Sequence, residues 1–386
     1  MRTRFALVAL GSCLLFVAPA GAQIQRSALH DFQMVPVAEG FETPWSMAWL
    51  PNGDMLVPER PGRLRIVRDG ELLTDPVPGI PEVHARGQGG LLDVQPHPDF
   101  ANNHWLYITF SKPQADDQST TTLIRGKFEN DALTDVEELF EAVARGRNGH
   151  YGSRIAFAGG YVFISAGDRQ APSRGDLEAH PAQDRSNHHG VIIRLHDDGR
   201  VPADNPFVGQ EGVLPETWSY GHRNPQGLAI HPVTGDLWAN EHGPQGGDEL
   251  NLIQPGRNYG WPVIGYGVNY GSGSTIHVGT MRETMEHPVH FWVPSIAASG
   301  LMIYTGDRFP GWTGSFFVGG MAGHQLARLT PSVDRPRRIE QEETLAYGIG
   351  RVRDVRQGPD GYIYLAIEDR RGAPTVVVRL EPVPRC

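Results

Sequence analysis

Cysteine is almost absent from this chain, and its scarcity excludes a fold held together by disulfides. The 386 residues include two cysteines, Cys13 near the start and Cys386 at the end. Because Cys13 lies in a segment that we expect to be removed, Cys386 has no intramolecular partner. A hydrophobic core or a bound metal must therefore stabilise the protein in place of covalent links.

Several motifs of cofactor and nucleophile chemistry are also missing. No G-x-G-x-x-G follows a strand, and neither a P-loop nor a G-x-S-x-G is present. Their absence argues against nicotinamide cofactors, nucleotide triphosphates and the serine-hydrolase pattern. His188, His189 and His222 do not stand at zinc-binding distance in sequence from any cysteine, which argues against a structural zinc site. The formal charge of −10 argues against nucleic acid and anionic membranes as partners.

The chain has one long apolar run, at its N-terminus, and this run has the features of a secretory signal. Two arginines precede the apolar residues 5–17, and the small residues 20–22 follow. The run is too short and wrongly flanked for a membrane span. We expect cleavage near Ala22 and a mature protein that starts near Gln23, in a bacterial periplasm or outside the cell. The alternative is lipid attachment at Cys13.

What the chain does have is a repeated hairpin pattern, with 47 glycines and 31 prolines to supply its turns. Each copy has a polar or glycine-rich lead, a short apolar strand, a tight turn and a second apolar strand. The six first strands start near Met47, Gly90, Ser153, Gly227, Gly300 and Val352.

Six hairpins of one design predict an all-β, six-bladed β-propeller formed by residues 23–386, because radial packing buries the faces that a lone hairpin exposes. The repeats average about 60 residues, more than the roughly 40–50 of compact propellers, so we expect long inter-blade loops. The strand Phe32–Val37 is expected to close the ring beside Val376–Leu380. Residues 131–143 have helical character and are expected to form a blade insertion. The alternative architecture is two stacked β-sandwiches.

Four polar residues of different chemistry stand directly before first strands of the repeats: Gln88, His150, Arg223 and Arg351. In a propeller, equivalent positions of different blades gather at one end of the central channel. An amide, a base and cations that converge there form a site. Turn chemistry alone is the alternative explanation for Gln88, whose loop is rich in glycine.

His150 is the candidate general base. Glycines flank it, so the backbone can turn tightly and present the imidazole at the entrance of a strand. A neutral imidazole accepts a proton from a hydroxyl near pH 7. The alternative is an ordinary histidine of a surface loop, since the chain has 16 histidines.

Arg351 and Arg353 are two apart on one strand and are therefore expected to point the same way. Two adjacent guanidinium groups indicate an anionic ligand with several carboxylates or a phosphate. The alternatives are a solvated pair at an edge, or pairing with Asp354 and Asp369. Arg223 adds a third cation, with Asn224 beside it.

The segment after the fourth hairpin contains a candidate calcium site. Gly243 and Pro244 form a bend that exposes successive carbonyl oxygens, and the carboxylates Asp248 and Glu249 follow. Carbonyl and carboxylate oxygens suit calcium, a hard cation. The alternative for the two carboxylates is a solvated turn.

Together these residues resemble the soluble quinoprotein sugar dehydrogenases of the glucose/sorbosone dehydrogenase family, and among them most of all the periplasmic aldose sugar dehydrogenases. The similarity extends over nearly the whole mature chain. The segments that carry it are GQGGLLDVQPHPDF, GHRNPQGLA, EHGPQGGDELNLI, NYGWP and GRVRDVRQGPDG.

The resemblance implies a six-bladed propeller that binds pyrroloquinoline quinone (PQQ) and calcium. Arg351 and Arg353 would bind the three carboxylates of the quinone. Other positions that contact the quinone are matched by Gln88, Arg223 and Asn224. Calcium positions are matched by Gly243 and Pro244 for a catalytic ion, and by Glu249 and Tyr259 for a structural one.

The same resemblance implies the reaction. His150 matches the base that takes a proton from the anomeric hydroxyl of an aldose while hydride passes to the quinone and a lactone forms. Arg223 and calcium would stabilise the developing negative charge, and an external electron acceptor would complete the cycle.

Two positions depart from the family pattern. Ala322 stands where relatives carry a lysine that contacts the cofactor, and Gly149 stands where some have an aspartate before the base. Two other functions stay open at this point: a calcium-dependent propeller lactonase or hydrolase in which His150 activates water, and a binding propeller without catalysis.

Overall fold

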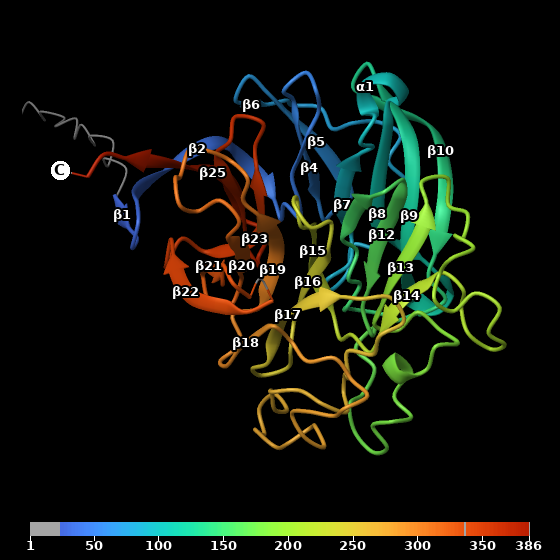
Figure 1. Ribbon diagram of the computed structural model, residues 1–386. Helices are drawn as coiled ribbons and strands as arrows, with labels where there is room; N and C mark the ends of the chain where they lie inside the picture. The colour runs from blue at the N-terminus through green and yellow to red at the C-terminus, as the bar shows by residue number, and fades with distance from the viewer. Residues whose placement is uncertain (1–23, 336, 386) are drawn as a thin grey trace, which may run out of the picture.

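The computed structural model describes residues 24–335 and 337–385, which form six β-sheets arranged around a common axis (Figure 1). One sheet has five strands and the other five have four each. This arrangement confirms the predicted six-bladed propeller and excludes two stacked sandwiches. The expected signal segment, its cleavage near Ala22 and the alternative lipid attachment at Cys13 lie outside the described residues.

The first half of the chain forms blades 1 to 3, each an antiparallel meander. Blades 1 and 2 consist of β3 (Ala48–Trp49), β4 (Met55–Glu59), β5 (Arg63–Arg68), β6 (Glu71–Leu72), β7 (Leu91–Pro96), β8 (Trp105–Pro113), β9 (Ser119–Glu129) and β10 (Ala132–Glu141). Blade 3 consists of β11 (Ile155–Ala158), β12 (Tyr161–Ala166), β13 (Val191–His196) and β14 (Thr217–Tyr220).

The second half forms blades 4 to 6. Blades 4 and 5 consist of β15 (Pro225–Ile230), β16 (Leu237–Glu241), β17 (Asp248–Ile253), β18 (His290–Trp292), β19 (Ala298–Ile303), β20 (Phe316–Gly320), β21 (Gln325–Pro331) and β22 (Ile339–Leu345). Blade 6 consists of β23 (Arg351–Gln357), β24 (Ile363–Glu368), β25 (Pro374–Val383), β2 (Asp31–Glu42) and β1 (Gln25–Arg26).

Each hairpin expected from the sequence forms the first two strands of one blade, and consecutive first strands contact one another near the axis. The apolar runs suit this position because a central strand is covered on both faces. Helix is scarce in the described residues: α1 (Phe100–Asn103) and the 3₁₀ turns η1 (Ala115–Asp117) and η2 (Pro181–Gln183). None of these helices is long and apolar enough to cross a membrane.

The ring closes through strands from the two ends of the chain. β2 pairs with β25 in antiparallel register, with Phe32 opposite Pro382 and Val35 opposite Arg379. This confirms the expected pairing of Phe32–Val37 with Val376–Leu380. Because blade 6 takes strands from both ends of the chain, β25 is paired on both sides and is not an exposed edge.

One expectation about the segments between hairpins was wrong. Residues 131–143 contain the strand β10 instead of a helix, because a turn at Asn130 and Asp131 brings them back to pair with β9. Long loops do join blades, as at residues 73–90 and 142–154, but the two longest, residues 167–190 and 254–289, lie within blades 3 and 4. The two longest loops lie at the same end of the molecule (Figure 1), and both contribute residues to one cavity, among them Asp168 and Tyr270.

The hydrophobic core is divided among the contacts between neighbouring blades. Between blades 5 and 6, for example, Trp312 and Phe317 pack with Val352 and Leu365, and all four are fully buried. Side chains from adjacent sheets interdigitate in this way around the ring. The apolar contacts therefore fix each blade against the next and hold the strand ends at the axis in place.

Candidate active site

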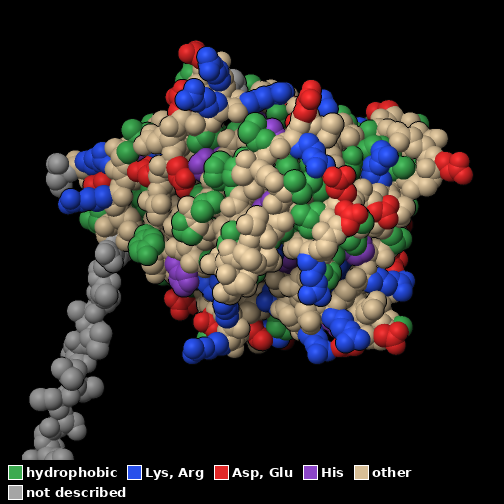
Figure 2. Space-filling model, turned by 90° about the horizontal axis from the view of Figure 1, so that it is seen from below, with side chains coloured by type: hydrophobic (Ala, Val, Ile, Leu, Met, Phe, Trp, Pro, Cys, Tyr) green, Lys and Arg blue, Asp and Glu red, His purple; other side chains and the backbone are tan. Residues whose placement is uncertain are grey.

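The starts of the innermost strands meet at one end of the channel, as expected. They border a cavity of about 910 Å³, which we call the arginine cavity, and an adjoining one of about 530 Å³, which we call the histidine cavity. Gln88, His242 and Tyr270 line both. Seen from this side, basic and acidic side chains are interspersed over the surface around the site (Figure 2).

Arg351 and Arg353 point together into the arginine cavity and share one carboxylate. The Nε atom of Arg351 lies 2.9 Å from Glu368 Oε1, and the Nε atom of Arg353 lies 2.8 Å from Glu368 Oε2. Although burial alone would raise it, these two arginines lower the pKa of Glu368 to about 2. The internal counter-ion is therefore Glu368, and not Asp354 or Asp369.

His150 lies in the histidine cavity and pairs with an aspartate. Its Nδ1 atom is 2.5 Å from Asp168 Oδ1, and the Oδ2 atom of Asp168 accepts a hydrogen bond from Trp261 Nε1 at 2.7 Å. Asp168 thus orients the ring. Gly149 stands where some relatives have an aspartate before the base, and here Asp168 supplies the carboxylate instead. An Nδ1–H that donates to Asp168 leaves Nε2 free to accept a proton.

The backbone at His150 is held in an uncommon conformation. His150 has φ of 51°, and its N–H donates to Gln88 Oε1 at 2.9 Å. A Cβ atom at Gly149 would lie 2.7 Å from the amide of Gln170, which would have to shift to make room for it. Strained backbone of this kind concentrates at functional sites.

The protonation state of His150 follows from its surroundings. Burial, followed by the charge of Arg223, lowers the pKa of His150 below the usual value for histidine, and the carboxylate of Asp168 only partly opposes this. The imidazole is therefore neutral near pH 7, which is the state of a proton acceptor. His242, which also lines this cavity, is half-buried, and desolvation together with neighbouring cations lowers its pKa.

Arg223 lines the histidine cavity, and Asn224, which follows it, is fully buried. Arg223 Nη1 donates to the carbonyl oxygens of Gly243 at 2.6 Å and of His242 at 3.0 Å. Asn224 Oδ1 accepts from the backbone N–H of Gly152 at 3.1 Å. Arg223 Nε and Asn224 Nδ2 are buried without a partner among the described residues. Buried donors of this kind indicate that a ligand supplies their acceptors.

The expected calcium positions lie around the bend after β16. The carbonyl of Pro244 accepts a hydrogen bond from the hydroxyl of Tyr270 at 2.9 Å. Glu249 lies on β17 beside Glu241, and burial, together with the charge of Glu241, raises the pKa of Glu249. Tyr259 lines the same small cavity as Glu241 and Glu249. No three His, Cys, Asp or Glu side chains within residues 24–335 and 337–385 are grouped as a metal site.

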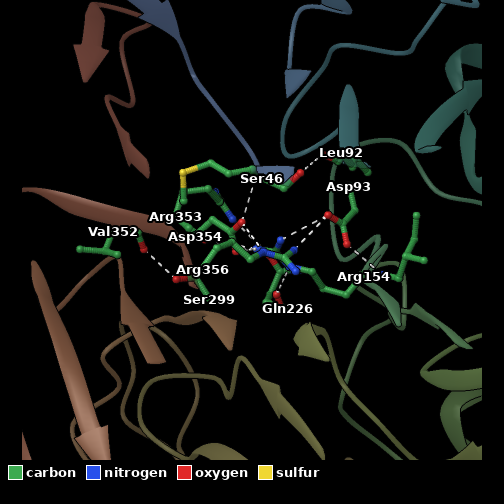
Figure 3. Close-up of polar contacts among 12 residues, drawn as sticks. Ser46, Leu92, Asp93, Arg154, Gln226, Ser299, Val352, Arg353, Asp354 and Arg356 are labelled. Atoms are coloured by element: carbon green, nitrogen blue, oxygen red, sulfur yellow. Dashed lines mark hydrogen bonds and ion pairs between the residues drawn. The ribbon is translucent and has the colours of Figure 1, made fainter. Parts of the chain in front are cut away.

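A buried charge cluster contacts Gln226 and Arg353 of the arginine cavity (Figure 3). Arg154 Nη2 lies 3.0 Å from Asp354 Oδ1, and Arg356 binds Asp354 at 2.8 Å and Asp93 at 3.2 Å. Arg154 Nε also donates to the carbonyl of Gln226 at 2.6 Å. The cluster joins blades 2, 3, 4 and 6.

The sequence interpretation missed the acidic partners Asp168 and Glu368. Both follow or end the second strand of a hairpin, as Glu241 does on β16. Because a hairpin returns its chain to the end where it began, a carboxylate there lies beside the start of the first strand. A carboxylate at this position of the repeat is therefore the sequence signal that could have indicated Asp168 and Glu368. Tyr270 and Trp261 lie in the long loop of blade 4, for which the repeat offers no signal.

The fold and the site define a class of propeller whose ligand site is built from the starts of the innermost strands. Within this class the chain belongs to the glucose/sorbosone dehydrogenase family, because the family model described as Glucose / Sorbosone dehydrogenase matches residues 41–378.

Three similar proteins are informative. An aldose sugar dehydrogenase of Escherichia coli is 38% identical over 374 residues, which cover 95% of each chain. The crystal structure of the soluble aldose sugar dehydrogenase from Escherichia coli in the apo-form has a TM-score of 0.83 at 36% identity, with 92% of this chain and 100% of that chain covered. The PQQ-bound aldose sugar dehydrogenase of Streptomyces coelicolor has a TM-score of 0.72 at 27% identity, with 91% and 98% covered.

Proposed function

We propose that this protein is a PQQ- and calcium-dependent aldose dehydrogenase that oxidises sugars at the anomeric carbon to lactones. The observation that carries the proposal is the neutral, aspartate-bound His150 beside a cavity lined with arginines. A base next to an anion-binding cavity suits the removal of a proton from a sugar while an acidic redox cofactor takes up hydride. The names of the similar proteins support the same reaction class.

The residues of the arginine cavity fit PQQ. The volume of about 910 Å³ accommodates a planar tricyclic ligand, and Arg351 and Arg353 present cations to its carboxylates. The unpartnered donors Arg223 Nε and Asn224 Nδ2 would find acceptors on the quinone edge, with Gln88 nearby. When bound, the quinone supplies a two-electron acceptor for hydride from the anomeric carbon.

The bend at Gly243 and Pro244 fits a calcium ion through its carbonyl oxygens, each of which has a second lone pair beyond the hydrogen bond that it accepts. Glu249 and Tyr259 would hold a second ion. Two carboxylates, Glu241 and Glu249, lie next to each other there, and Asn251 Oδ1 is buried without a partner among the described residues. Such a group of oxygens is stabilised by a divalent cation.

Each of the chain's own residues at the site then has a separate role in the reaction. His150 accepts the proton of the anomeric hydroxyl on Nε2, and Asp168 stabilises the imidazolium that results. Arg223 places positive charge where the sugar oxygen becomes negative. Trp261 holds Asp168 in place and keeps water from its second oxygen.

Reconstitution tests the proposal. Purified apo-protein is mixed with PQQ and calcium, and then with glucose and an artificial electron-accepting dye. We expect sugar-dependent dye reduction that requires both additions. Hydrolysis of a lactone without the quinone would instead support a propeller lactonase, and the absence of turnover would support a binding propeller.

We further propose that the protein acts in the periplasm or outside the cell after cleavage near Ala22. The apolar N-terminal segment and the similarity to an Escherichia coli aldose sugar dehydrogenase support this location. N-terminal sequencing of protein recovered from the periplasmic fraction checks it, with Gln23 expected at or near the start.

A further inference from the structure

The charged side chains that line the arginine cavity are unequal in number. Four guanidinium groups, of Arg60, Arg351, Arg353 and Arg370, face a single carboxylate, Glu368. Four cations less one carboxylate leave three positive charges. Both oxygens of Glu368 are bound by Arg351 and Arg353, so this carboxylate has no strong capacity left for another cation.

Arg60 is the cation of this group that no sequence pattern indicated. It follows β4 directly, and its guanidinium donates to the carbonyl oxygens of Gly89, at 3.2 Å, and of Gly87. In the part of the chain that the structure describes, no carboxylate lies within ion-pair distance of Arg60. Burial, and then the charge of Arg353, lowers the pKa of Arg60. A half-buried cation that other cations repel is costly unless an anion joins it.

The position of Arg60 complements the missing lysine. Ala322, which stands where relatives carry a lysine, lines the same cavity but brings no charge. It follows β20 of blade 5, whereas Arg60 belongs to blade 1, and blade 6 with Arg351 and Arg353 lies between them. Arg60 therefore places a cation on the other side of the arginine pair.

We propose that Arg60 binds a carboxylate of the cofactor and replaces the cationic contact that Ala322 cannot make. The inference rests on the proposed function, because it needs PQQ as the ligand. The net positive charge of the wall then faces the carboxylates of the ligand. Arg370 contributes less, because its side chain is exposed at the rim and water screens its charge.

Binding to the apo-protein tests this without any turnover. Quenching of tryptophan fluorescence, to which Trp45 in the cavity wall contributes, gives the Kd for PQQ and for its uncharged trimethyl ester. We expect Arg60→Gln to raise the Kd for PQQ by about tenfold to a hundredfold, which corresponds to the loss of one charge-assisted contact. The Kd for the ester should change by less than about threefold, because the ester lacks the charge that Arg60 attracts.

Controls separate charge from structure. Arg60→Lys should keep most of the affinity for PQQ, Arg370→Gln should weaken it only a few fold, and Arg200→Gln, an exposed arginine outside the cavity, should not change it. If Arg60→Gln weakens both ligands equally, Arg60 merely holds the Gln88 loop through Gly87 and Gly89, and the inference is wrong. Equal Kd values for PQQ in Arg60→Gln and wild type also overturn it. If the wild-type protein binds no PQQ, the proposed function itself fails.

Discussion

The imidazole of His150 lies between an acid and a cation, and this environment decides its chemistry. Asp168 fixes the tautomer that leaves Nε2 free, whereas burial and Arg223 disfavour the protonated ring. The carboxylate of Asp168 raises the pKa of His150 and Arg223 lowers it, but both favour the same function. They produce an oriented and neutral base.

Removal of the base should separate binding from chemistry. We expect His150→Ala to bind PQQ with unchanged affinity and to lose reduction of the bound quinone by sugar by about 10²–10⁴-fold, the range for a general base. Fluorescence titration and stopped-flow absorbance measure the two properties. His104→Ala, which changes a partly exposed histidine outside the site, is the control. Loss of PQQ binding in His150→Ala with normal residual chemistry would contradict the role.

The pH dependence should follow the lowered pKa of His150. The base works when it is neutral, so activity is present above its pKa and falls as the pH drops through it. Because that pKa lies below 6.5, the acid limb of the kcat/KM profile should lie below pH 6.5. Asp168→Asn removes the charge that raises this pKa, so the limb should shift further to acid and the maximum rate should fall. An unchanged acid limb would show that Asp168 does not act on His150.

At the scale of elements, the hairpin repeat predicts the inner half of each blade well and the outer half poorly. Inner strands such as Leu106–Ile108 are fully buried, so their apolar runs are visible in the sequence. Outer strands such as β10 are exposed on one side and carry charged residues that also suit a helix. Pairing with β9 decided the outcome there, because strand preference depends on neighbours.

Ring closure by β2 gives a prediction for the elements. Deletion of residues 24–37 should lower the free energy of unfolding by at least about 3 kcal/mol, because it removes the buried ring of Phe32 and leaves the edge of β25 unpaired. Denaturant titration measures the loss, and gel filtration should show association through the open edge. A monomer of unchanged stability would mean that β2 is dispensable for the ring.

At the scale of the whole molecule, charges on the axis connect blades that are distant in sequence. Arg154 and Arg356 come from blades 3 and 6, and their carboxylate partners Asp93 and Asp354 from blades 2 and 6. Arg154 also donates to the carbonyl of Arg353 at 3.3 Å and stacks on Trp45, both of which line the arginine cavity. The charge cluster thus supports residues of the ligand site.

Breaking this cluster should affect the entire fold. We expect Arg154→Met to lower the free energy of unfolding by about 3–5 kcal/mol, because it leaves Asp93 and Asp354 with too little compensating charge. Urea denaturation followed by circular dichroism measures it. Arg200→Met, which removes an exposed ion pair with Asp198, should cost less than about 1 kcal/mol. Equal effects of the two substitutions would show that the axial charges are not important for stability.

The sequence by itself determined the number of blades and four of the polar residues at the channel end. Buried hairpins and their turns recur visibly, so the repeat alone places Gln88, His150, Arg223 and Arg351 at equivalent positions. Their convergence follows from the symmetry of a closed ring.

Only the tertiary structure decided which partner each of these residues has. Glu368 instead of Asp354 binds the arginine pair, Asp168 orients His150, and Arg60 joins the cavity from another blade. These contacts join residues far apart in the chain, and their choice depends on distances of a few ångströms between packed blades. Local propensity and periodicity carry no information about such distances, since they describe neighbours in sequence alone.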